Sequence, residues 1–126
     1  MKHPRSRHLF HTFGAALNGI RIAFQEELSF KIMIAIAFFA IIAMIILPTS
    51  RTEKAVAWVM IFSVLVLELI NAVVERILDI MYPDYNPRIG AIKDLMAGIV
   101  LVAALGSLII AWLIFASKIP LLQSLV

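Results

Sequence analysis

The sequence predicts an all-α membrane protein, with three transmembrane helices preceded by an amphipathic helix at the membrane interface. Hydrophobic residues make up 63% of the 126 residues, and the mean hydropathy is +1.01. A soluble domain is about 45–50% apolar. Three segments are also long enough to cross a bilayer, which takes about 20 apolar residues. A chain of this length forms one domain, 1–126.

The first expected element is an amphipathic helix at about residues 7–27. Its apolar side chains recur at helical spacing and its polar side chains occupy the other side, which is typical of a helix lying in the membrane interface. A helix packed on a partner subunit is the alternative. The apolar positions are Leu9, Phe10, Phe13, Ala16, Leu17, Ile20 and Phe24, and the polar ones are His11, Asn18, Arg21 and Gln25.

Three apolar segments follow, and we expect them to span the bilayer at about 30–47, 55–78 and 94–115. Pro48 closes the first span because proline cannot easily continue a helix. The connection at about 80–91 is rich in Pro, Asn and Asp, so we expect a loop at the membrane surface.

Lysine and arginine placement predicts the orientation of the spans, because these residues accumulate on the cytoplasmic side. We expect the N-terminus and the 80–91 loop in the cytoplasm and the C-terminus outside. Eight basic residues fall on the first side: Lys2, Arg5, Arg7, Arg21, Lys31, Arg76, Arg88 and Lys93. Three fall on the other: Arg51, Lys54 and Lys118.

The second span carries polar residues that are costly in hydrocarbon. Glu68, Asn71, Glu75 and Asp79 fall on one strip about 80° wide if each residue advances about 100° around a helix. Ionisable residues within a membrane span indicate a functional site by default. The structural alternative is that they form hydrogen bonds between helices.

The depth of these residues suggests separate roles. Glu75 and Asp79 are nearest the cytoplasm, where carboxylates can bind Mg²⁺ together with substrate phosphates. Glu68 is two turns deeper, which suits a general base acting on a group presented from within the bilayer. Stacked carboxylates also repel one another unless a cation or a proton intervenes.

Further charged residues are expected at the cytoplasmic side of the membrane, level with Glu75 and Asp79. Glu26 and Glu27 precede the first span, and Lys93 and Asp94 stand at the expected start of the third, where the helix dipole favours anions. Carboxylates for a divalent cation, a lysine and a buried base fit phosphoryl transfer. The sequence has neither a Walker motif nor the glycine-rich loop of protein kinases.

Three stretches resemble the prokaryotic diacylglycerol kinase/undecaprenol kinase family of small membrane lipid kinases. They are NGIRIAFQEELSFK, ELINAVVERILD and PDYNPRIGAIKDLMAGIVLVAA, and the resemblance covers about residues 10–115. The family signature of Glu, Asn, Glu and Asp matches the polar strip of the second span. A Lys-Asp pair follows in the family, here at 93–94.

The resemblance implies a homotrimer in the bacterial cytoplasmic (inner) membrane that transfers the γ-phosphate of MgATP to a lipid hydroxyl, in active sites shared between subunits. It also implies residue roles by motif position. These are Glu68 as general base; Glu27 and Glu75 as metal ligands; Asn71, Glu75, Lys93, Asp94, Tyr85, Asn86, Gly90 and Arg7 at the ATP; and Asp79 and Glu26 as supporting residues.

The chain departs from the family pattern at a few positions. Ala72 and Val73 stand where Ser or Thr and then Ala are usual, and Asn86 stands where His is common. The NGIR stretch, the Glu-Arg pair at 75–76 and the P-x-Y-x-P loop resemble the undecaprenol kinase branch. Undecaprenol is therefore favoured as the substrate over diacylglycerol.

A small oligomeric channel or transporter is the alternative from a different class, with Glu68 and Glu75 lining a polar path. Such a path needs polar residues through the outer half of the bilayer. In that half the second span reads AVAWVMIFSVL, which is almost without polar residues and disfavours a channel or transporter. A catalytically inactive relative is disfavoured by the intact signature. Three short spans also leave the polar strip poorly covered, which predicts an oligomer. Nothing indicates nucleic-acid binding.

Overall fold

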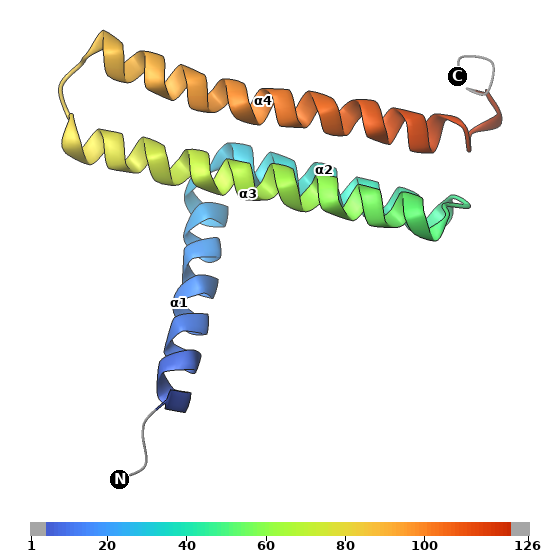
Figure 1. The fold of residues 1–126 in the computed structure, drawn as a ribbon, viewed down its shortest axis with the longest axis horizontal. Coiled ribbons are helices and arrows are strands. Elements are labelled where there is room, and N and C mark those ends of the chain that lie inside the picture. Colours follow the sequence, from blue (N-terminus) through green and yellow to red (C-terminus); the bar gives the residue numbers. More distant parts are fainter. Residues whose placement is uncertain (1–4, 122–126) are drawn as a thin grey trace.

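The computed structural model describes the backbone of residues 5–121 and the side chains of residues 10–121. These residues form four α-helices and no strand: α1 (Arg5–Glu26), α2 (Leu28–Ile46), α3 (Arg51–Met81) and α4 (Pro87–Ala116). Helices α2, α3 and α4 run side by side, and α1 projects away from them (Figure 1). The predicted all-α class is confirmed.

Helices α2, α3 and α4 are each long and apolar enough to cross a membrane. This confirms that the chain has three such segments, as predicted. The helices that contain them differ in their ends from the expected 30–47, 55–78 and 94–115. The 31 residues of α3 extend over about 46 Å at 1.5 Å per residue, whereas the hydrocarbon core is about 30 Å thick. Part of α3 therefore projects beyond the hydrocarbon.

The turn between α2 and α3 follows from its sequence. Leu47 is extended because it precedes Pro48, and α2 stops there. Ser50 then starts α3 with a capping box: its hydroxyl accepts from the Glu53 amide at 3.2 Å, and the Glu53 carboxylate accepts from the Ser50 amide at 2.7 Å. As a result α3 begins at Arg51, four residues before the expected position 55.

The start of α4 corrects the sequence prediction more substantially. The expected loop at 80–91 is only residues 82–86, and α4 begins at Pro87 instead of 94. Proline is well tolerated at the first helical position, and the Asn86 side chain caps the helix by accepting from the Arg88 amide at 3.0 Å. Lys93 therefore lies beyond the first turn and its free N–H groups. The helix-dipole argument for Lys93–Asp94 is wrong.

The buried core of the chain is small and joins the three long helices. It centres on Met44, Ala57 and Ile114, with Ile41, Ile61, Ile110 and Phe115 packed against it. An ion pair of 3.0 Å between Lys118, two residues after the end of α4, and Glu53 joins this end of the chain to the first turn of α3.

Many large apolar side chains elsewhere are exposed on the single chain, including Phe10, Phe13 and Leu17 of α1. Exposed apolar faces of this kind suit contact with lipid or with other subunits. The position of α1 in the membrane interface remains a prediction.

Candidate active site

The polar strip of α3 passes from a buried end to an exposed end. Glu68 is 4% exposed and Asn71 is 9% exposed. One turn further, Glu75 is half-buried, and the side chain of Asp79 is 64% exposed. The strip therefore offers one deep carboxylate and, within three turns of helix, groups that water and a soluble substrate can reach.

Glu68 has a partner on α2. The hydroxyl of Ser29, in the first turn of α2, donates to Oε1 of Glu68. A buried carboxylate needs such a donor because burial without hydrogen bonds is costly. Sequence analysis did not identify Ser29 as a site residue. Its signal was weak, since it is a lone hydroxyl before an apolar run, and the contact depends on how α2 packs on α3.

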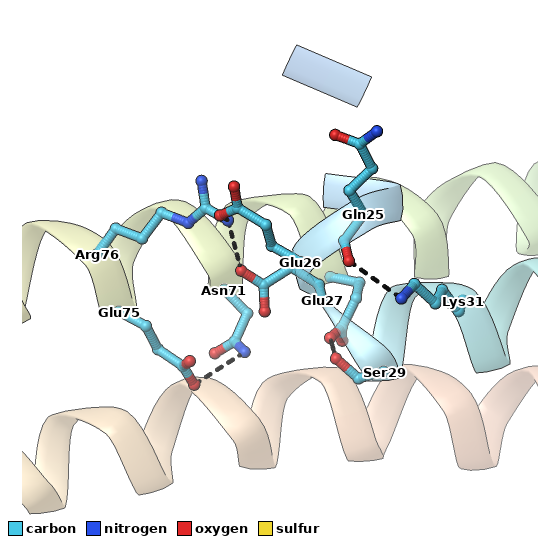
Figure 2. Close-up of polar contacts among 9 residues, drawn as sticks. Gln25, Glu26, Glu27, Ser29, Lys31, Asn71, Glu75 and Arg76 are labelled. Atoms are coloured by element: carbon cyan, nitrogen blue, oxygen red, sulfur yellow. Dashed lines mark hydrogen bonds and ion pairs between the residues drawn. The ribbon is translucent and has the colours of Figure 1, made fainter. Parts of the chain in front are cut away.

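Asn71 is only partly satisfied. Its Nδ2 donates to Glu75 Oε1 at 3.2 Å (Figure 2), whereas its buried Oδ1 has no hydrogen-bond partner among the described residues. A buried acceptor without a partner costs about 1–3 kcal/mol. Such a group in a native structure calls for an explanation, and one is a donor or cation that arrives with a ligand.

Arg76 connects α3 to the junction between α1 and α2. Its Nη2 donates to Glu26 Oε2 at 2.9 Å and to Glu27 Oε1 at 2.8 Å (Figure 2). Glu26 ends α1, and Glu27 is the single residue between α1 and α2. The ion pairs thus bring both carboxylates to α3. Arg76 was not predicted as a site residue, because it lies about 80° around the helix from Glu68, outside the strip.

The exposed end of the strip has a partner on α4. Lys93 Nζ donates to Asp79 Oδ1 at 2.5 Å, so the predicted lysine does lie beside the strip. Asp94, the next residue, is exposed. The structure therefore joins Asp79 and Lys93 directly and leaves Asp94 at the surface.

The other residues implied at the ATP are not joined to the strip. Tyr85 is 92% exposed in the 82–86 loop, and Asn86 caps α4. Gly90 lies in the first turn of α4, with open space where a side chain would be. Within residues 10–121, no hydrogen bond or ion pair links these three to α3. Arg7 lies in α1, and its side chain is outside the described part of the chain.

Comparison with known proteins agrees with the family resemblance seen in the sequence. The family model for prokaryotic diacylglycerol kinase matches residues 14–115. The chain belongs to this family. It is also 32% identical over 110 residues to the undecaprenol kinase of Bacillus subtilis (strain 168), an alignment that covers 87% of this chain and 89% of that relative. The chain is accordingly a lipid kinase and a multi-pass membrane protein, with ATP as the co-substrate.

The donors of the site fit a hard cation such as Mg²⁺. Glu27, Glu75 and the Asn71 Oδ1, which has no hydrogen-bond partner among the described residues, all offer oxygen atoms, the donor type that Mg²⁺ prefers. In the described part of the chain, no group of three His, Cys, Asp or Glu residues is gathered tightly enough to hold a metal alone.

Proposed function

We propose that the protein transfers the γ-phosphate of MgATP to the hydroxyl of undecaprenol. The observation that carries the proposal is the polar strip of α3, which has a buried carboxylate at one end and accessible polar groups at the other. A lipid alcohol approaches from the hydrocarbon and ATP approaches from water. A site that runs from one medium to the other suits a reaction between two such substrates.

Glu68 is the proposed general base. It removes the proton of the lipid hydroxyl while that oxygen bonds to the γ-phosphorus and the bond to ADP breaks, giving the lipid phosphate and ADP. Its burial supports this role because a base at that depth meets a hydroxyl held within the membrane. The hydroxyl of Ser29 orients the carboxylate.

The nucleotide and the cation belong at the shallower part of the strip. Glu27 and Glu75 would hold Mg²⁺, which when bound neutralises phosphate charge. Asn71 and Lys93 would contact the phosphates, and Lys93 would exchange its present partner, Asp79, for them. The set is completed by Asp94, Asp79 and Glu26, and by Tyr85, Asn86, Gly90 and Arg7 near the nucleotide.

We further propose a homotrimer with shared active sites in the bacterial cytoplasmic membrane, its N-terminus inside and its C-terminus outside. The small core and the exposed apolar faces of α3 and α4 support an oligomer. Gly98 and Gly106 of α4 face open space within one chain, which leaves room for close approach of a second helix. The helix α1 would lie in the cytoplasmic interface.

The substrate is the finer part of the proposal. The relative from Bacillus subtilis is named undecaprenol kinase, and that name supports undecaprenol over diacylglycerol. The test is phosphate transfer from labelled ATP by purified protein in mixed micelles, with each lipid in turn and with Mg²⁺ or EDTA. We expect Mg²⁺-dependent turnover, with a higher kcat/KM for undecaprenol. A higher kcat/KM for diacylglycerol would refute the assignment of undecaprenol.

A further inference from the structure

Arg76 binds the same carboxylate that we assign to the divalent cation. Its Nη2 bridges Glu26 Oε2 at 2.9 Å and Glu27 Oε1 at 2.8 Å. A guanidinium is permanently charged and only donates hydrogen bonds, so it satisfies a carboxylate much as a metal ion does. A cation held by Glu27 would compete with Arg76 for the negative charge of this carboxylate and for its Oε1.

The contact is placed where it can exchange. The side chains of Arg76 and Glu27 are 40% and 24% exposed, and ion pairs reached by solvent are weak enough to open readily. One helical turn before Glu75, Asn71 presents a buried oxygen that has no hydrogen-bond partner within residues 10–121. The region therefore combines the Glu27 carboxylate, held by the replaceable guanidinium of Arg76, with the Asn71 oxygen, which lacks a donor among the described residues.

We propose that Arg76 is a counter-ion that holds Glu27 in the cation-free enzyme and competes with the divalent cation for it. The inference rests on the proposed function, because it takes Glu27 as a metal ligand. Arg76 then keeps the α1–α2 junction against α3 between turnovers. It also sets the cation concentration that the enzyme requires, and its return to Glu27 favours release of the cation after transfer.

The test compares the binding of Mn²⁺ alone by the wild-type protein and by two variants, with free Mn²⁺ measured by EPR in detergent solution. Arg76→Gln removes the charge, and we expect about two- to fivefold tighter binding, the factor that an exposed ion pair is worth. Arg76→Lys keeps the charge and should bind Mn²⁺ as the wild type does.

Lys54→Gln is the matched control for net charge. It removes one positive charge from an exposed position that lies 22 residues earlier on α3, about 33 Å along the helix axis, and should leave the affinity for Mn²⁺ unchanged. The free Mg²⁺ concentration at half-maximal kinase activity should fall by the same factor in Arg76→Gln as its Mn²⁺ dissociation constant.

Several outcomes would overturn the role of Arg76. Mn²⁺ binding by Arg76→Gln that equals the wild-type affinity, is weaker or is undetectable contradicts competition. Poor folding of the variant would weaken Mn²⁺ binding, so it cannot mimic the expected tighter binding. Failure of the proposed function has a separate signature, since the wild-type protein would then phosphorylate neither lipid. The Mn²⁺ titration requires no turnover and is read independently of that result.

Discussion

Removing the hydroxyl of Ser29 tests whether the partner of Glu68 matters for the chemistry. Ser29 Oγ donates to Oε1 of Glu68, a residue that is only 4% exposed. Hydrogen bonds to charged groups contribute about 1.5–3 kcal/mol. In the proposed active complex the lipid hydroxyl also donates to Glu68, so only part of this stabilisation is lost in Ser29→Ala. We expect about 1–1.5 kcal/mol of lost transition-state stabilisation, which is about five- to twelvefold in kcat.

The assay is the initial rate of phosphate transfer to undecaprenol at saturating MgATP. Ser29→Thr retains the hydroxyl and should stay close to the wild-type kcat. Ser63→Ala is the matched control, because the Ser63 hydroxyl donates to the Val59 carbonyl of its own helix at 2.7 Å. The KM for ATP should not change in Ser29→Ala. A kcat of Ser29→Ala within a factor of two of that of Ser63→Ala would refute a role for this hydrogen bond in orienting the base.

Three further substitutions separate nucleotide contacts from structural ones. Asn71→Ala should lower kcat/KM for MgATP by about a hundredfold, the effect of losing a preorganised polar contact. Its Tm should change little, because the lost hydrogen bond from Nδ2 to Glu75 is offset by removal of a buried Oδ1 that has no partner among the described residues; a large fall in Tm with unchanged kcat/KM would contradict this. Lys93→Met should raise the KM for ATP by about tenfold or more, as expected for a phosphate contact, and an unchanged KM would place Lys93 with Asp79 alone. Glu53→Ala removes the capping box and the pair with Lys118 and should lower the Tm by a few degrees without altering the KM for ATP.

The sequence predicts the α3 strip well because helical periodicity alone brings Glu68, Asn71, Glu75 and Asp79 to one side. It does not predict Ser29 or Arg76, whose contacts cross between helices. The hydroxyl of Ser29 and the guanidinium of Arg76 become meaningful only when the packing of α2 and the α1–α2 junction against α3 is known. Pairing across helices depends on tertiary geometry, for which a single sequence carries little signal.

The start of α4 differs from the predicted one although the sequence carries a signal for it. Asn86 followed by Pro87 is a good helix-start signal, yet the abundance of Pro, Asn and Asp around it suggested a longer loop. Other predictions concern the assembly. Tyr85, Gly90 and Arg7 come from the family resemblance. In the proposed trimer their distance to the strip depends on how neighbouring subunits pack.

The most direct test of the central claim is the rate of phosphate transfer to undecaprenol by Glu68→Gln. This substitution keeps the size and polarity of the side chain and removes its ability to accept the lipid proton. General-base catalysis contributes about 10²–10⁴-fold, so we predict a loss of that size in kcat, with binding of a non-hydrolysable ATP analogue retained. A Glu68→Gln protein that phosphorylates undecaprenol at the wild-type rate would contradict the assignment of the α3 strip as the active site.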